Sequence, residues 1–179
     1  EPEPEPEPEP TPVIPTSPSW ALQYQNNDPN TFKNTIAMKS VVSIDGYLYS
    51  IGWRGGGGTD GEDGSIYKDV AEVLLTQTKE NGKTTKQYTL NSGELDNGFS
   101  ICLSNDGNSI FICGITNGDL SKNYSSKMTS SSWVGGRTDI FVAKYTLTQN
   151  GDLELTWITQ YGSQYVDAAI DITIDDAND

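Results

Sequence analysis

Residues 97–114 read NGFSICLSNDGNSIFICG, a pattern that predicts one β-hairpin. Apolar residues alternate with small polar residues up to Leu103, and a second apolar run covers residues 110–113. Between the two runs stands Asp106-Gly107, a pair that tolerates the positive φ of a tight hairpin turn. We therefore predict two antiparallel strands joined at this pair.

The hairpin register also decides how the two cysteines relate to each other. A turn centred on Asp106-Gly107 places Cys102 opposite Phe111 and Cys113 opposite Ser100. The thiols are then diagonal neighbours with Cβ atoms roughly 7 Å apart, whereas a disulfide needs about 4 Å. We expect two reduced cysteines, buried and packed as small hydrophobic side chains, and a bulge that shifts the register would reverse this expectation.

The rest of the chain repeats this hairpin together with two further strands. The pair Gln-Tyr recurs at residues 23, 87 and 160. The segment 43–52 matches 104–114, and the run that starts at Asp69 matches the run that starts at Asp139. Each period then holds about four strands, and four antiparallel strands in roughly 60 to 70 residues are typical of a β-propeller blade with a long loop.

The domain organisation follows from a change in composition near residue 19. Residues 1–18 begin with five Glu-Pro pairs and remain proline-rich. Proline fixes φ and the glutamates repel one another, so we predict a disordered, extended linker of polyproline-II type. Residues 19–179 form the repeat region, with blade-like repeats starting near residues 20, 84 and 157, the last of them truncated.

Propellers need about four to eight blades, and this chain supplies two and a fraction. The sequence therefore predicts a partial propeller. The missing blades would come from the same longer chain, or from other copies in a homo-oligomer.

Composition excludes several classes of function. The 179 residues carry a net charge of −14, which argues against nucleic acid and anionic membranes as partners because both attract basic patches. The chain has no histidine, which removes Ser-His-Asp and Cys-His catalysis and the usual zinc sites. No apolar run reaches the roughly 18 residues of a membrane span. Many short β-branched or aromatic runs between turn residues favour the all-β class.

Four motifs resemble a known family. They are Ser104-Asn-Asp-Gly-Asn-Ser-Ile-Phe-Ile-Cys-Gly114, Thr116-Asn-Gly-Asp-Leu120, Gly135-Gly-Arg-Thr-Asp-Ile-Phe-Val-Ala-Lys-Tyr145 and Trp157-Ile-Thr-Gln-Tyr-Gly162. Together they look like the SBBP-type bacterial β-propeller repeats, closely over residues 96–179 and loosely over 20–95. The resemblance implies a multi-bladed propeller and a secreted or cell-surface location.

Few residues are candidates for chemistry. Trp53 and Trp133 lie in or beside the long loops and are the candidates for ligand contact. The glycine-rich stretch 55–64 holds three carboxylates that suit calcium, although a single copy of this pattern is more simply a polar loop. Asp139, at a strand start, is expected to accept hydrogen bonds from backbone amides of the adjoining turn.

The sequence thus favours a non-catalytic extracellular module that serves as a structural, adhesive or protein-interaction platform. No catalytic, metal-binding or cofactor-binding residue is assigned, and calcium is the one cofactor left open. The alternatives are a carbohydrate-binding lectin formed by ring completion between chains and, third, a glycosidase or lyase. The expected partner is a protein, a cell-surface component or a glycan, without nucleic acid and without membrane insertion.

Overall fold

The computed structural model describes residues 34–43, 46–55, 71–79, 85–131, 133 and 137–175, and this part of the chain is all-β, as predicted. Its one helix is α1 (Ser121–Tyr124). No helix in the described ranges is long and apolar enough to cross a membrane. The strands are β1 (Asn34–Val42), β2 (Leu48–Gly55), β3 (Ala71–Thr78), β4 (Thr85–Leu90), β5 (Asp96–Leu103), β6 (Ser109–Thr116), β7 (Met128–Ser131), β8 (Asp139–Leu147) and β9 (Leu153–Tyr161).

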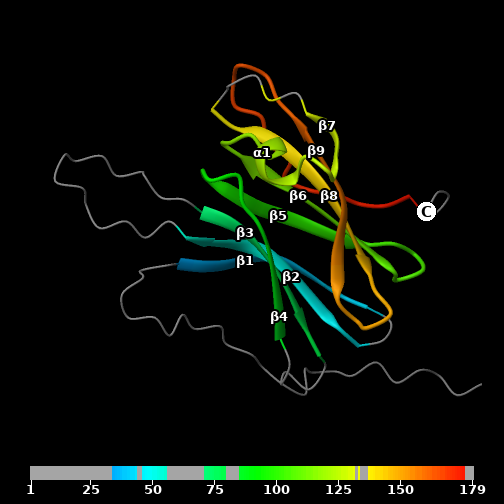
Figure 1. Cartoon of the computed structure of the whole chain (residues 1–179). Helices are drawn as coiled ribbons and strands as arrows, with labels where there is room; N and C mark the ends of the chain where they lie inside the picture. Colours follow the sequence, from blue (N-terminus) through cyan, green and yellow to red (C-terminus); the bar gives the residue numbers. More distant parts are fainter. Residues whose placement is uncertain are drawn as a thin grey trace, which may run out of the picture.

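The strands form two sheets that pack against each other (Figure 1). The first sheet has the order β1-β2-β3-β4, and every neighbouring pair is antiparallel. The second sheet has the order β5-β6-β8-β9-β7, in which the first four strands repeat the antiparallel meander and β7 joins β9 in parallel at the edge. Strand β5 lies over β1, β2 and β3 of the first sheet.

The sheets are one strand out of step with the sequence period. Strand β4 carries Gln87-Tyr88 and is the last strand of the first meander, and β9 carries Gln160-Tyr161 and is the last strand of the second. The sequence copies that start near residues 84 and 157 therefore each begin with the last strand of a meander. The predicted linker at 1–18, the copy near residue 20, the carboxylates of the glycine-rich stretch and Asp69 lie outside the described residues.

The predicted hairpin is confirmed as β5 and β6. Cys102 faces Phe111 and Ser100 faces Cys113, as the centring on the Asp-Gly turn requires. Gly107 has a φ of 72°, a value that favours glycine. The turn is closed by local hydrogen bonds, because the Ser104 hydroxyl donates to the Asp106 carboxylate at 2.5 Å and accepts from the Ser109 amide at 2.8 Å.

A bulge at the same place in β1 and β5 shows that the sheets are built on one plan. The register with the following strand shifts between Ala37 and Lys39 in β1, and between Gly98 and Ser100 in β5. A glycine stands opposite each bulge, Gly52 in β2 and Gly114 in β6. A Cβ atom on either glycine would overlap a backbone carbonyl oxygen of the bulged strand. The bulges therefore fix which residues of the two sheets are equivalent. A residue of β1 and its equivalent in β5 are 61 positions apart in the sequence.

The hydrophobic core fills the space between the two sheets. Ile51 of β2 lies against Gly98 of β5, where a larger residue would clash with it. Tyr88 and Tyr145 bring their rings to 6.4 Å from each other across the interface. The buried members of the core are Tyr49, Ile51, Val73, Leu75, Leu90, Ile101, Ile110, Ile112, Leu120, Phe141, Ala143, Tyr145, Leu153 and Ile158.

A buried polar network closes the interface at the end of the sheets where the β5–β6 and β8–β9 hairpins turn. The Gln77 side chain accepts a hydrogen bond from the Tyr88 hydroxyl at 3.1 Å and donates to the carbonyl of Gly151 at 3.1 Å. The Leu153 amide donates to the Tyr88 hydroxyl at 3.0 Å. These bonds join the first sheet to the β8–β9 turn of the second. The opposite end, where β2 and β6 finish, is called the loop end below.

Candidate contact surface at the loop end

Trp53 lies two residues before the end of β2 and packs between the two sheets. It is half-buried, and it pairs across the strands with Ile36 and Val73. Its ring meets that of Phe99, the bulged residue of β5, edge to face at 6.0 Å. Sequence reasoning placed Trp53 beside a loop as a ligand contact, and the structure gives it this packing role in addition.

Trp133 follows β7 and keeps 41% of its surface exposed. The ammonium group of Lys122, from α1, stands 5.5 Å above the centre of its ring. Such a cation covers one face of the indole and leaves the other available. Among the described residues no ring contact joins Trp133 to Trp53, so the structure does not bring the two candidates into one site.

Helix α1 is tied to the connection between the two sheets. The side-chain amide of Asn123 donates to the carbonyl of Asn91 at 2.7 Å, and the amide of Asn91 donates to the Tyr124 hydroxyl at 3.0 Å. Asp119 accepts from the Ser121 amide at 3.0 Å, which stiffens the turn before the helix. The loop that carries Lys122 is therefore held in a defined place beside Trp133.

A buried polar row crosses the second sheet beneath this loop. Asp96, Thr116 and Asp139 face one another on β5, β6 and β8, and each is no more than 1% exposed. The Gln160 side-chain amide donates to Asp139 at 2.8 Å and to the carbonyl of Gly118 at 3.0 Å. The row therefore fastens the loop after β6 onto the sheet.

Asp96 is a buried carboxyl group whose pKa is raised above its usual value. Burial raises the pKa of Asp96 to about 6, and hydrogen bonds from Ser92 oppose part of that rise. The Ser92 amide donates to the carboxylate at 2.7 Å and its hydroxyl at 2.9 Å. Asp96 thus performs the turn-closing role that the sequence suggested for Asp139.

The expectation for Asp139 is wrong in its hydrogen bonding. Its position opposite Thr116 turns the carboxyl into the interface between the sheets, where it meets the Gln160 side chain. Its second oxygen has no hydrogen-bond partner among the residues that the structure describes. Burial raises the pKa of Asp139, the Gln160 hydrogen bond opposes this, and the nearby charge of Asp167 adds to it.

A second polar cluster lies where β1, β5 and the C-terminal described segment meet. The Lys39 ammonium donates to the Ser100 hydroxyl at 2.9 Å and to the Asp171 carboxylate at 2.5 Å. The Ser100 hydroxyl donates to the same carboxylate oxygen at 2.5 Å. Hydrogen bonds from Lys39 first, then from Ser100, lower the pKa of Asp171 to about 2. The cluster keeps this carboxylate ionised and joins three segments of the chain.

Sequence reasoning missed this cluster although a signal for it exists. Lys39 and Ser100 stand at equivalent positions, immediately after the bulge of β1 and of β5. The equivalence of Lys39 and Ser100 follows from the position of the bulges, and the local sequence does not indicate where the bulges lie. A comparison of repeats by strand register would have singled out both residues.

The two cysteines are free thiols, as expected. Cys113 is buried as expected, whereas the expectation of burial is wrong for Cys102, which is only half-buried. Burial raises the pKa of Cys113 to about 11, with the charge of Asp171 adding to the rise, and burial also raises the pKa of Cys102. Both thiols therefore remain protonated at neutral pH, which makes them poor nucleophiles.

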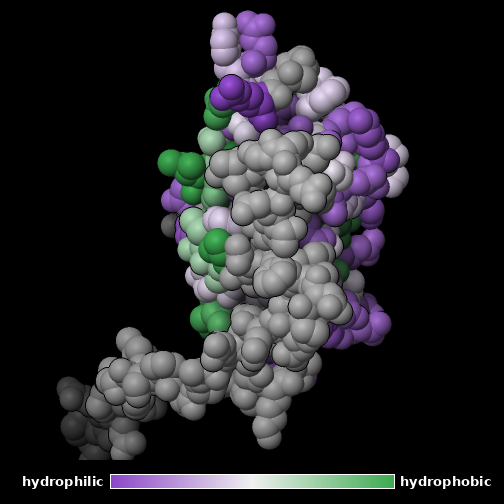
Figure 2. All heavy atoms as spheres, turned by 90° about the vertical axis from the view of Figure 1, so that its left-hand side faces the viewer, coloured by the Kyte–Doolittle hydropathy of each residue, from purple (hydrophilic) through white to green (hydrophobic). Residues whose placement is uncertain are grey.

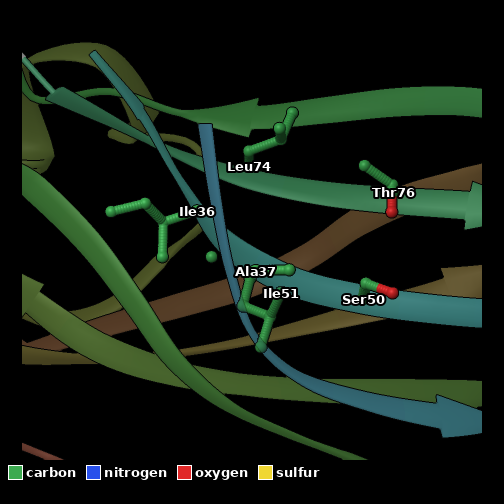
Figure 3. A pocket seen from close by; sticks show the side chains of 7 residues that line it. Ile36, Ala37, Ser50, Ile51, Leu74 and Thr76 are labelled. Atoms are coloured by element: carbon green, nitrogen blue, oxygen red, sulfur yellow. The ribbon is translucent and has the colours of Figure 1, made fainter. Parts of the chain in front are cut away.

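The outer face of the first sheet carries a shallow apolar pocket (Figure 3). The hydroxyl of Thr76 in its lining is buried and finds no hydrogen-bond partner in the described ranges. Large exposed hydrophobic side chains of β1 lie nearby in sequence, and Figure 2 shows hydrophobic atoms gathered along one side of the molecule and polar atoms along the other. The pocket is lined by Ile36, Ala37, Ser50, Ile51, Gly52, Leu74 and Thr76.

Two comparisons of the chain with known proteins find no relative. No protein-family model matches the chain, and no curated protein matches it significantly.

Proposed function

We propose that the chain is a non-catalytic, extracellular module of the β-propeller type that serves as a structural, adhesive or protein-interaction platform. The observation that carries the proposal is the repetition of one four-stranded antiparallel meander, with the same bulge, in two sheets packed against each other. Propeller blades have this meander. The resemblance of residues 96–179 to SBBP repeats supports the same reading.

The chemistry of the described polar groups favours a non-catalytic role. The Ser100 hydroxyl is in contact with Lys39, yet Ser100 is fully buried and hydrogen-bonded to Asp171. The two buried carboxyls of the polar row, Asp96 and Asp139, lie on opposite sides of β6 and do not reach solvent. A substrate would have to displace the loop after β6 to meet either of them.

Among the residues that the structure describes, Trp133 is the best candidate for a contact with a partner. Aromatic side chains with an exposed apolar face recur as dominant contacts in protein interfaces. Lys122 beside the ring adds a positive charge to a strongly acidic chain. A protein surface with an apolar pocket next to a carboxylate would complement both groups.

Binding of the chain to an array of extracellular proteins tests this role. For a partner found in that way, Trp133→Ala should weaken binding about tenfold or more, since truncated hot spots cost that much. Trp133→Phe is the matched variant and should retain most of the affinity. Equal binding by all three proteins would remove Trp133 from the contact surface, and turnover of a polysaccharide by the chain would contradict the non-catalytic role.

The lectin alternative is favoured by one feature, the exposed indole face of Trp133, on which a sugar ring can stack. A glycan array with the folded chain separates the two functions. Binding that free sugar competes away would favour the lectin, and a defined trimer in solution would favour ring completion between chains. A longer native chain, seen by mass spectrometry, would favour blades supplied by the same polypeptide.

A further inference from the structure

The C-terminal residues 167–174, named here the acceptor segment, run in extended form along the second sheet (Figure 1, in red). The segment is anchored at its start, where the Asp167 amide donates to the carbonyl of Thr138 at 2.9 Å. In the middle, the Ile172 amide donates to the Ser100 hydroxyl at 3.3 Å, and the Cys113 thiol points at the carbonyl of Ala169 at 3.7 Å. These contacts fix its place, and the first of them belongs to an isolated parallel bridge between Thr138 and Val166.

The acceptor segment is the third copy of the strand that begins each meander, after β1 and β5. Ser92, before β5, and Asp96, its first residue, match Ser163 and Asp167. In both pairs the serine amide donates to the carboxylate at 2.7 Å, and the serine hydroxyl donates to it at 2.9 Å. The separation of these pairs is 71 residues. The same separation takes Gly98 to Ala169.

Packing supports the same equivalence. Gly98 receives Ile51 of the preceding sheet. The Cys113 thiol donates to the carbonyl of Ala169, and Cys113 occupies in β6 the place that Ile51 occupies in β2. A small residue therefore lies beside the preceding sheet at the equivalent point of both copies, and the acceptor segment lies on the second sheet as β5 lies on the first.

The two preceding copies pair with a following strand, whereas residues 168–174 pair with no strand in the part of the chain that the structure describes. Strand β5 forms a ladder with β6, and β1 forms one with β2. Within the described residues, 168–174 make no backbone-to-backbone hydrogen bond. Ile170 is also 75% exposed. The Ile172 amide and the Ala169 carbonyl bond to side chains, and the other main-chain groups of residues 168–174 have no hydrogen-bond partner within the described ranges. A segment with main-chain groups left unpaired and an exposed apolar side chain is a template for strand addition.

The two existing ladders define which strand would fit. Opposite the bulge, β2 and β6 both carry glycine, because a Cβ atom there would overlap the carbonyl of Ile36 or of Asn97. Before that glycine both strands have an apolar residue followed by an aromatic one, Leu48-Tyr49 in β2 and Ile110-Phe111 in β6. The fitting strand thus has an apolar residue, an aromatic residue, two further residues and a glycine.

We propose that the acceptor segment is a binding site for an extended polypeptide strand of this pattern, which adds antiparallel to it with its glycine opposite Ala169. The inference goes beyond the proposed function because it depends only on the register of the repeats. The partner is recognised by main-chain hydrogen bonds, and the glycine supplies the selectivity. A partner with a side chain at the glycine position is excluded sterically.

A labelled peptide of residues 47–55, YLYSIGWRG, tests the site with the full chain. We expect saturable binding by fluorescence anisotropy, with amide hydrogen exchange slowed at residues 168–174. The matched peptide with Gly52→Val should bind about tenfold or more weakly, because overpacking of a ladder carries that penalty. Failure of the first peptide to bind, or equal binding of both, would overturn the proposal.

A variant of the chain separates this site from other strand edges. Ile170→Pro removes an amide donor and should abolish peptide binding, whereas Ile170→Ala keeps the donor and should bind. Since residue 170 makes no ladder bond, both variants should keep the thermal unfolding temperature of the parent. Protection by the peptide at β1 or β4 in place of residues 168–174 would assign the binding elsewhere and contradict the proposal, whatever the array experiment for the proposed function shows.

Discussion

Equivalent positions of the two sheets carry opposite kinds of side chain. In the first sheet Ser40 faces Ser50 on the outer face, and their hydroxyls are 2.8 Å apart. In the second sheet the same cross-strand pair is Ile101 and Ile112, both fully buried against the first sheet. The strand plan is the same in both, so the place of a sheet in the stack, and not its backbone, decides whether the pair is polar or apolar.

The loop end repeats this contrast with charged groups. Arg54 of β2 donates to Glu72 of β3 at 2.9 Å and 2.5 Å, and both side chains are partly exposed. The second sheet has Thr116 and Asp139 at these positions, both buried. An ion pair that water reaches loses little free energy of hydration on folding. Buried charges lose much more, so a buried position favours smaller polar groups held by hydrogen bonds.

The direct way to break the comparison is to exchange the paired residues. Ile112→Ser should lower the free energy of unfolding by about 4 kcal/mol, because it removes buried apolar volume and buries a hydroxyl. Ser50→Ile, at the equivalent outer position, should change it by no more than about 0.5 kcal/mol. Urea unfolding followed by tryptophan fluorescence measures both. Similar losses in the two variants would show that both faces are equally buried.

The bulge glycines give the next largest effect. Gly114→Ala should cost about 3 kcal/mol, because the added Cβ meets the carbonyl of Asn97 and the ring of Phe141. The three atoms nearest a Cβ at Gly52 all belong to the backbone of β1, with no ring among them, so Gly52→Ala should cost about 1 kcal/mol. Thermal unfolding of both variants ranks them. A larger effect at Gly52 would contradict the view that the second sheet is the more constrained.

The buried carboxyl of the second sheet should make stability depend on pH. The pKa of Asp96 is raised to about 6 in the folded chain, so the folded state holds its proton more tightly than the unfolded state does. This contribution is present at low pH and is lost as the pH rises through about 6, which amounts to about 2 kcal/mol between about pH 4.5 and pH 7. Asp96→Asn should flatten this part of the stability curve, measured by urea unfolding.

A turn carboxylate serves as the control for that experiment. A hydrogen bond from Ser104, followed by those from Asn108, lowers the pKa of Asp106 to about 2. Its contribution is therefore present above about pH 4 and is lost as the pH falls towards 2. Asp106→Asn should leave the slope between about pH 4.5 and pH 7 unchanged. A slope that survives in Asp96→Asn would assign the pH dependence to another group.

The smallest effect is expected at the partly exposed ion pair of the first sheet. Removal of Arg54 and Glu72 singly and together should give a coupling energy below about 1 kcal/mol, because solvent screens the pair. Thermal unfolding of the four proteins supplies this double-mutant cycle. A coupling above about 2 kcal/mol would mean that the pair is as protected from water as the polar row of the second sheet.

The sequence predicts the hairpin well because its determinants are local. Asp106-Gly107 specifies the turn, and once the turn is placed, the facing residues follow by counting. The all-β class also follows from short apolar runs between turn residues. Of the candidate site, exposure of Trp133 agrees with its position beside a loop, whereas the stacking of Lys122 on its ring depends on the fold.

Features that depend on contacts between distant strands were not predictable in this way. The match of Gln87-Tyr88 to Gln160-Tyr161 is two residues out of step with the strand register, because Gln160 faces Phe141 whereas Thr89, not Gln87, faces the equivalent Leu74. By the same register the counterpart of Asp139 is Glu72, and the sequence alignment pairs Asp139 with Asp69. Similar dipeptides recur for reasons of strand chemistry, and only the ladder decides which of them are equivalent.

The serine–aspartate hydrogen bonds at the start of β5 and of the acceptor segment have a consequence for how the chain folds. Ser92 and Asp96, like Ser163 and Asp167, are four residues apart, so their hydrogen bonds close over a very short loop. Contacts of such low sequence separation form early, ahead of the sheet-to-sheet packing. The direction in which each new unit leaves the previous one is thereby set locally during synthesis, and a growing array of such units can fold in sequence from its N-terminal end.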